Sequence, residues 1–442
     1  MPNVGTGAAK VEKGKNDKKP IPKCIVYFRP ETSYKGEFGF DWLRVKDNGL
    51  AAEPDYESII ESGYKDGSTD YTKPEAYNAL KREYKKIPFI MGFNTYYIPY
   101  LNLFSKTYSD TVNITPKPSY EAKLKVLVEI KDADVDEIKF EFNKSIFSIN
   151  DKEEFSLPDK NICPLKISTT IKITCKKDIT TDADGEILVY AYPKGSKSKP
   201  ETEQKAERKL AGKLIVGKND AANRKEAKFV FVCVKTNITG SSIITGQFTQ
   251  DERDQLRSVL YQVLVRPLIW VGKKYWKGLR EQDIILDITN DVNFKRGGKY
   301  INARGKLNED ADGGSMFSYL RDKFKNDTAN SFYKDCFPVF AIGAENYDGA
   351  LGQVEGIGVK NLVLFNGRDS QTIGHEALHG FGLWHTHRER SGEPIIQQAN
   401  KKYVFPHGHS DPNNATDNVM SYRQNNMITT WNWQWKIIRK NV

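Results

Sequence analysis

The sequence predicts a multidomain protein with a β-rich front half, which includes a β-sandwich, followed by an α+β domain. Three observations lead to this fold class. The chain has 442 residues, more than one hydrophobic core usually serves. Residues 120–236 alternate apolar and polar side chains in several short runs, the pattern of half-buried antiparallel strands. From residue 237 onward, helical and strand-like segments follow one another instead.

The overall composition excludes several classes of protein. Apolar residues make up 38% and aromatic residues 12% of the chain, which is enough to build folded cores. No apolar run reaches the roughly 18 residues of a transmembrane helix. The net charge is +10, and part of this excess lies in the lysine-rich segment 10–23. Basic residues are not interleaved with aromatic ones, so we expect no nucleic-acid partner.

The N-terminal segment predicts a disordered tail over residues 1–20, because it is small, polar and rich in lysine. It has no apolar stretch of the kind found in signal peptides of the general export pathway. Two localisations remain open. One is secretion without a classical signal peptide, into the extracellular space or into a target cell, and the other is the cytoplasm.

Residues 21–119 are predicted to form a mixed, β-rich N-terminal domain. A strand-like run begins at Cys24, and a helix is expected over residues 74–87 with Pro74 in its first turn. Residues 96–104 are aromatic and favour a strand.

Residues 120–236 are predicted to form an immunoglobulin-like β-sandwich, because short alternating strands follow one another between turn residues. In the first strand, Leu124, Val126 and Val128 share one face and charged residues share the other. The further predicted strands cover residues 137–142, 165–175, 186–192, 213–217 and 228–234, with a polar loop over 194–207.

Residues 237–442 are predicted to form a separate α+β domain. Thr249 and Glu252 have the spacing of a capping box, which predicts the start of a helix over residues 251–264. A closing helix is expected to pack on this domain through Trp431 and Trp435, which lie one turn apart. The other predicted elements are strands over 283–289, 337–343 and 359–365, a helix over 370–381 and the closing helix over 431–440.

The five cysteines indicate neither a disulfide framework nor a thiolate zinc site. Their number is odd, their spacings are long and no CxxC motif occurs. Burial as small core residues is expected for most of them. A disulfide between Cys163 and Cys175 stays open, as does a zinc-blocking role for Cys24. The five are Cys24, Cys163, Cys175, Cys233 and Cys336.

The six histidines all lie between residues 375 and 409, and three of them follow the pattern H-E-x-x-H-x-x-G-x-x-H. On a helix, residues four apart share one face, so His375 and His379 can bind one ion. Gly382 can adopt the left-handed conformation that ends a helix, which lets the chain return and bring in His385. Three neutral imidazoles with a fourth position left to water are typical of catalytic zinc. Glu376 lies beside that position and is the candidate general base.

This segment resembles the long zinc motif of the metzincin clan of zinc endopeptidases at every defining position of residues 375–385. The clan also has a methionine-containing turn downstream of the motif, and Met420 in NVMSY matches it. Tyr422 matches a tyrosine that astacin-like and serralysin-like members place near the metal. Thr386, the residue after the third histidine, does not assign a subfamily.

The resemblance implies a zinc endopeptidase that hydrolyses peptide bonds with metal-activated water. Glu376 would take the proton of the water and pass it to the leaving amine. Tyr422 would stabilise the oxyanion. An extended protein or peptide substrate would pair with a strand at the edge of the cleft, and residues 359–365 are the expected strand by position.

Other polar motifs carry weaker predictions. His387, His407 and His409 have spacings that suit a second metal, but exposed loop histidines are the favoured interpretation. Two DADG stretches, 182–185 and 310–313, suit calcium as a second cofactor, and a tight hairpin turn explains the first equally well.

The front half resembles N-terminal regions that precede toxic domains in bacterial contact-dependent (type VI) secretion cargo. This resemblance implies a secreted effector or toxin, whose β-rich half would bind a component of the secretion apparatus. Two alternatives to an endopeptidase remain. The chain could be a non-catalytic delivery or binding protein with a degenerate zinc domain, or a zinc amidase that acts on cell-wall peptides.

Overall fold

The structure is a computed structural model of the chain. It describes residues 23–44, 56–60, 65–66, 69–70, 73–88, 90, 95–131, 135–150, 154–156, 165–270, 283–387, 403, 416–421 and 427–442. The predicted tail over 1–20 lies outside the described residues, as do Cys163, His407, His409 and Tyr422.

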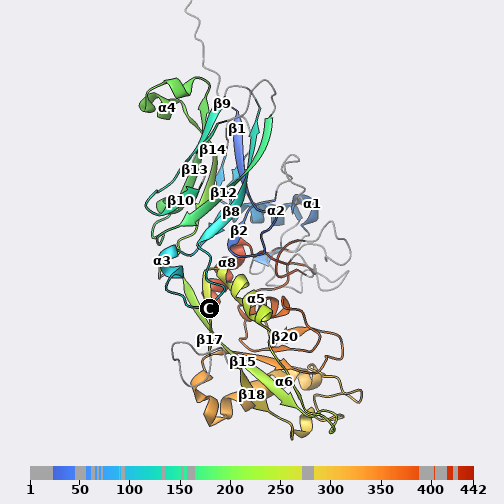
Figure 1. Ribbon diagram of the computed structural model, residues 1–442. Coiled ribbons are helices and arrows are strands. Elements are labelled where there is room, and N and C mark those ends of the chain that lie inside the picture. The colour runs from blue at the N-terminus through green and yellow to red at the C-terminus, as the bar shows by residue number, and fades with distance from the viewer. Residues whose placement is uncertain are drawn as a thin grey trace, which may run out of the picture.

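The front half consists of two mainly antiparallel β-sheets that pack on a shared core (Figure 1). Their inward-facing side chains meet between the sheets, where the rings of Phe28 and Phe140 lie 6.3 Å apart. The first sheet has the order β1 (Cys24–Pro30), β8 (Glu121–Ile130), β12 (Leu165–Cys175), β10 (Phe147–Asn150). The second has the order β11 (Glu154–Ser156), β9 (Val135–Glu141), β13 (Glu186–Pro193), β14 (Lys209–Val216), β7 (Tyr100–Asn102), β2 (Gly39–Asp41).

The strands predicted from alternation are therefore confirmed, but the predicted boundary at residue 119 does not match the strand pairing. Strand β1 pairs with β8 along its whole length, from Cys24 opposite Ile130 to Pro30 opposite Leu124. Strands β2 and β7 extend the second sheet. Residues 21–119 thus supply strands to both sheets, because pairing joins segments that are distant in the sequence.

The C-terminal half is built on a seven-stranded sheet of mixed direction. Its longest strand, β15 (Lys225–Thr236), pairs in parallel with neighbours on both sides. The other strands are β16 (Ile244–Thr245), β17 (Val265–Trp270), β18 (Ile284–Asp287), β19 (Phe337–Ile342), β20 (Gly352–Val354) and β21 (Leu362–Leu364). The structure is thus β-rich in front and mixed α and β behind.

The prediction that residues 228–234 belong to the sandwich is wrong, because they form the centre of this seven-stranded sheet. Phe229 and Phe231 face one hydrophobic core, and Val230 and Val232 face a second core on the other side of the sheet. A strand with a core on both faces is apolar almost throughout, as parallel strands commonly are. In composition, such a run resembles a sandwich strand, which is why it was predicted to belong to the sandwich.

Helices cover both faces of this sheet. On one face lie α5 (Gln250–Tyr261), α7 (Thr372–Gly380) and α8 (Asn432–Asn441), and on the other lies α6 (Ala311–Asn326). The capping box of Thr249 and Glu252 forms as predicted at the start of α5. The sequence missed α6. In Figure 1, α5 and α8 lie between the front sheets and the C-terminal sheet.

The remaining elements are short. The predicted helix over 74–87 is α2, which ends at Arg82, and the predicted loop over 194–207 contains two helical segments. The short elements are α1 (Tyr56–Ile59), β3 (Lys65–Asp66), β4 (Thr69–Asp70), α2 (Lys73–Arg82), β5 (Lys86–Ile87), β6 (Tyr96–Tyr97), α3 (Lys106–Ser109), α4 (Glu201–Glu207), and the 3-10 helices η1 (Ala183–Gly185), η2 (Ser196–Ser198), η3 (Val292–Phe294) and η4 (Thr328–Tyr333).

Two further expectations concern membranes and thiols. Within the described residues, no helix has the combined length and hydropathy that crossing a membrane requires. Cys24, Cys175, Cys233 and Cys336 are buried thiols, as expected. The thiol of Cys175 donates a hydrogen bond to the carbonyl of Lys177 at 3.3 Å.

Candidate metal centre

The helix of the zinc motif, α7, is anchored by its own sequence. The Asp369 side chain accepts hydrogen bonds from the main-chain N–H groups of Gln371 and Thr372, both at 3.0 Å, which satisfies donors of the first turn. Ile373 and Ala377 pack into the core beneath the sheet. With every residue of α7 buried, its direction is fixed by packing.

The three histidines of the motif converge as the sequence predicts. The Nε2 atoms of His375 and His379 each lie 3.0 Å from Nε2 of His385. All three ligand atoms lie within 4.8 Å of one another. Ligand nitrogens on a tetrahedral zinc ion lie about 3.3 Å apart, because Zn–N bonds are about 2.0–2.1 Å long. The spacing therefore fits one zinc ion.

Main-chain carbonyls set the protonation of two of these rings. Nδ1 of His375 lies 2.8 Å from the carbonyl oxygen of Val419, and Nδ1 of His379 lies 2.7 Å from that of Leu383. A carbonyl oxygen only accepts, so Nδ1 carries the proton in both rings. Nε2 is then left with its lone pair, the form in which an imidazole binds a metal. The donor set fits zinc in chemistry as well as in spacing.

The third ligand depends on the turn that ends α7. Gly382 has φ +91°, the left-handed conformation expected for it. The N–H of Leu383 bonds to the carbonyl of Leu378, and that of Gly382 bonds to the carbonyl of His379. These two bonds form a Schellman motif, which reverses the chain just past the helix. His385 is thereby brought back toward the ligands on α7.

The methionine turn lies against this centre. Met420 is fully buried in the same core as α7. Its carbonyl accepts hydrogen bonds from the N–H of Thr386 at 3.0 Å and from the Thr386 hydroxyl at 3.3 Å. The turn is therefore bonded at two places: Val419 to His375, and Met420 to Thr386, the residue that follows His385. The predicted partner of this turn, Tyr422, lies outside the described residues.

Glu376 is buried on the side of α7 that faces strand β20. Its carboxylate accepts a hydrogen bond from the main-chain N–H of Val354. Burial raises the pKa of Glu376 to about 8, and this hydrogen bond opposes the rise. A Cβ atom added to Gly352 would lie 3.1 Å from Cγ of Glu376, so glycine lets β20 run close to the helix.

The expected substrate strand needs a correction. Residues 359–365 contain β21, which lies between β19 and β20 and uses both of its edges for pairing. The outer strand on this side of the sheet is β20, which pairs antiparallel with β21. Residues 359–365 were chosen because they directly precede the zinc helix in the chain. In the sheet, however, β20 and β21 form an antiparallel pair in which β20, the earlier strand, lies at the edge.

The remaining predicted polar sites differ from the expectation in part. His387 is 1% exposed and stacks on the ring of His385 at 4.9 Å, so the prediction of an exposed loop histidine is wrong for it. Asp184 accepts hydrogen bonds from Thr181 and Asn143, and Asp312 pairs with Lys299. In the described part of the chain, the histidine trio is the only group of three such ligands close enough for one metal.

Two supporting residues escaped the sequence analysis. Asn418 and Gln434 exchange reciprocal side-chain hydrogen bonds at 2.8 and 3.0 Å. The Asn418 side chain also accepts from the N–H of Met420 at 2.9 Å, which shapes the methionine turn. An asparagine before a turn is a general signal for local capping. No nearby sequence pattern, however, indicated that Asn418 pairs with Gln434 on α8.

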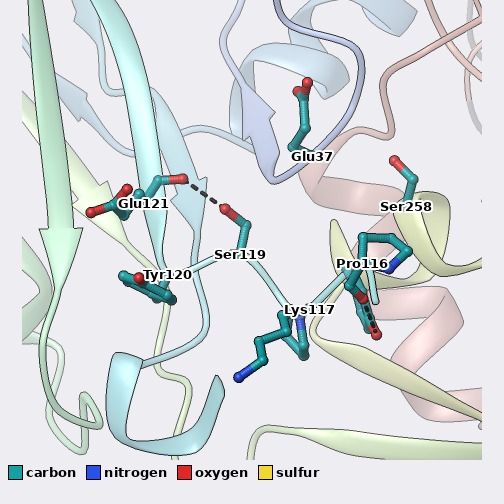
Figure 2. Close-up of a pocket in the computed structure, with 9 residues that line it drawn as sticks. Glu37, Pro116, Lys117, Ser119, Tyr120, Glu121 and Ser258 are labelled. Atoms are coloured by element: carbon teal, nitrogen blue, oxygen red, sulfur yellow. Dashed lines mark hydrogen bonds between the residues drawn. The ribbon is translucent and has the colours of Figure 1, made fainter. Parts of the chain in front are cut away.

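A separate cavity of about 330 Å³ lies between the front sheets and α5 (Figure 2). It contains no residue of the histidine trio. Its two serine hydroxyls are occupied locally, since the Ser119 hydroxyl donates to the carbonyl of Glu121 and the Ser258 hydroxyl donates to that of Gly36. The lining residues are Glu37, Pro116, Lys117, Pro118, Ser119, Tyr120, Glu121, Ser258 and Tyr261.

Comparison with known proteins adds no assignment. No protein-family model matches the chain, and no curated protein matches its sequence. The resemblance to metzincins therefore depends on the motif and on the geometry described above.

Proposed function

We propose that the chain is a zinc-dependent endopeptidase. The observation that carries the proposal is the convergence of three histidine Nε2 atoms, two of them on rings whose Nδ1 faces a carbonyl oxygen. His375, His379 and His385 would hold the ion. Three imidazole ligands leave a zinc ion room for water and substrate, which distinguishes catalytic from structural sites.

The same proposal includes the fold of each half of the chain. We infer a metzincin-like domain because the zinc helix ends at a left-handed glycine, a third histidine follows, and a buried methionine turn packs beside them. An antiparallel edge strand next to the zinc helix supports the same assignment. We infer an immunoglobulin-like sandwich for the front sheets from their antiparallel pairing over one core.

In this mechanism, a bound zinc ion supplies a Lewis acid that activates water and polarises the scissile carbonyl. Glu376 holds the proton taken from water and passes it to the leaving amine. Strand β20 borders Glu376 and orients an extended peptide through main-chain hydrogen bonds. Tyr422 is the proposed donor to the oxyanion.

The biological setting remains part of the proposal. We infer a secreted effector or toxin whose front half mediates delivery, and whose substrate is a protein or peptide.

The first test measures metal content and hydrolysis together. The wild type should bind about one zinc per chain and cleave a denatured general protein substrate in a chelator-sensitive manner. Glu376→Ala should keep the zinc and lose hydrolysis by several orders of magnitude, because the general base is missing. His379→Ala should lose both, because a ligand is missing.

A matched control is Glu309→Gln, since Glu309 is also a buried glutamate of the C-terminal half, and its carboxylate accepts a hydrogen bond from the side chain of Asn346. It should retain zinc and hydrolysis. A wild type that binds no transition metal refutes the proposal. A zinc protein that cleaves cell-wall peptides but no protein substrate would favour the amidase instead.

A further inference from the structure

We propose that Asp41 and Arg44, which belong to the front half of the chain, are positioning residues of the metal centre. They contact the segment that carries the methionine turn and the start of α8. The inference rests on the proposed zinc centre. It makes the front half an integral part of that centre, so it is neither a removable latency segment nor a delivery module alone.

The buried Arg44 side chain contacts the segment that carries the methionine turn through the partly exposed carboxylate of Asp417. Arg44 is 2% exposed, and its Nη2 lies 3.0 Å from each carboxylate oxygen of Asp417. Its guanidinium lies over the ring of Trp42 at 3.8 Å, and Nη1 donates to the Trp42 carbonyl at 3.2 Å. A planar guanidinium held on one face and bonded at its edge has little freedom to move.

Asp417 passes this constraint to a zinc ligand over a short path. Its carbonyl accepts hydrogen bonds from the N–H groups of Ile428 and Thr429, at 3.0 and 2.9 Å. The carbonyl of Thr429 accepts from the N–H of Val419 at 2.8 Å. The carbonyl of Val419 is the acceptor that orients His375. Only one residue, Asn418, therefore separates Asp417, which contacts Arg44, from Val419, which contacts His375.

Asp41 supplies a second connection to the same turn. It is fully buried and accepts hydrogen bonds from the N–H of Asn432 at 2.8 Å and from the hydroxyl of Tyr84 at 2.7 Å. Asn432 is the first residue of α8, where free N–H donors favour a negative charge. Gln434, in the same helical turn, holds Asn418 of the methionine turn.

The two connections act on the orientation of a ligand rather than on zinc itself. Groups that orient the ligands of a zinc ion typically change metal affinity by on the order of 10- to 100-fold when removed. Because Arg44 is buried, removing the Asp417 carboxylate also leaves a buried guanidinium without one of its partners. We therefore expect changes at Arg44 or Asp417 to weaken zinc binding in the folded protein.

The test uses the full chain and compares Arg44→Lys, Arg44→Met and Asp417→Asn with the wild type. Zinc affinity is measured by competition with a chromophoric chelator, and folding by the melting temperature of the zinc-free protein. Cobalt is then bound in place of zinc, because its visible absorption reports the geometry of the ligands. We expect zinc affinity to fall about 10- to 100-fold, with a changed cobalt spectrum.

Arg208→Lys provides the matched control. Arg208 pairs with Glu141 and lies over the ring of Tyr190 at 4.0 Å, so it has the same chemistry within the front sheets. It should lower the melting temperature of the zinc-free protein without changing zinc affinity or the cobalt spectrum. This comparison separates positioning from a general loss of stability.

The outcomes are distinguishable. Arg44→Lys and Asp417→Asn proteins that fold and bind zinc and cobalt as the wild type does overturn the inference and leave the proposed function intact. A wild type that binds neither metal overturns both. If Arg44→Met does not fold, the two milder variants decide. Equal loss of zinc affinity in Arg208→Lys would also overturn the inference.

Discussion

At the scale of single residues, the candidate site depends on groups that are not ligands. Val419 and Leu383 contribute only carbonyl oxygens, yet these hold the Nδ1 protons of two imidazoles and leave their Nε2 atoms free to bind a metal ion. Gly382 contributes only its conformation, and it brings the third histidine back to the first two. The ligands are therefore useful only because the main chain around them is fixed.

Replacing Gly382 with alanine should damage the metal centre. Its φ of +91° is strained for alanine, and the added Cβ would lie 2.7 Å from the side-chain nitrogen of Asn441. The left-handed conformation alone costs about 1–2 kcal/mol. We expect lower stability by at least that amount together with weaker zinc binding, measured by denaturant unfolding and by chelator competition.

Gly349→Ala isolates the backbone strain. Gly349 has φ +88°, but a Cβ atom there would meet nothing within 4 Å. It should lose a similar free energy of unfolding through strain and keep its zinc affinity. If both variants bind zinc equally well, Gly382 does not position His385.

At the scale of elements, three separate segments combine to form the candidate centre. Helix α7 carries two ligands, the turn at residues 418–421 accepts from one of them, and α8 holds that turn through Gln434. The C-terminal helix was predicted to pack through Trp431 and Trp435 together. Trp435 does pack with α7, whereas Trp431 precedes the helix and joins the core shared with the front half.

Removing the amide link between the turn and α8 should destabilise the protein. Gln434→Ala removes both partners in this exchange: the acceptor for the buried Asn418 amide N–H and one donor to its carbonyl oxygen. Such a loss costs about 1–3 kcal/mol. The free energy of unfolding, measured with denaturant, should fall by this amount, and the double variant with Asn418→Ala should lose less than the sum of the two single changes.

Gln250→Ala is the control for this change. Gln250 also donates to a neighbouring carboxylate on a helix, that of Asp254 at 2.8 Å, but the bond is exposed. Its loss should change the free energy of unfolding by no more than about 0.5 kcal/mol. Strict additivity of the Asn418 and Gln434 variants would contradict the reciprocal bond.

At the scale of the whole molecule, the two halves share a core and are not joined by a simple linker. Leu80 and Tyr84 of the front half pack with Trp431 and Trp433 of the C-terminal half. Asn102, at the end of a front strand, donates to the carbonyl of Gln262 beyond α5. Contacts of this kind couple the unfolding of the halves.

Removing zinc should therefore lower the stability of the whole chain. A ligand that binds only the folded state stabilises it by about 4 kcal/mol at a thousandfold excess over its Kd. In calorimetry, we expect one unfolding transition that shifts to lower temperature with chelator and returns with added zinc. Added calcium should not restore it, because the described calcium candidates are bonded to protein groups.

Two separate transitions, only one of which moves with chelator, would contradict this coupling. Fluorescence of the buried tryptophans should follow the same transition as the β-sheet signal in circular dichroism.

The local predictions succeeded where the signal was local. The alternation of Leu124, Val126 and Val128 predicted a strand, because side chains on one face of a strand repeat every two residues. The capping box at Thr249 predicted the start of α5 to within a residue. The zinc motif predicted which three histidines meet, because helix geometry and a left-handed glycine determine their directions over eleven positions.

The predictions failed where the partner was distant. Residues 228–234 were predicted to be a sandwich strand but pair within the C-terminal sheet, because composition does not reveal which sheet a strand joins. His387 was predicted to be an exposed loop residue but is buried, because burial depends on how distant segments pack. No pattern near Arg44 indicated a contact with Asp417.

The amino-acid sequence by itself determined the identity of the metal-ligand candidates and the strands and helices with clear periodicity, because short spacings translate directly into directions. The tertiary structure decided which strand forms the sheet edge, which carbonyls orient the imidazoles and how the front half reaches the methionine turn. Strand order and the bond from His375 to Val419 depend on how separate segments pack, and the contact between Arg44 and Asp417 joins residues 373 positions apart. Only the packing of the complete chain brings such residues together.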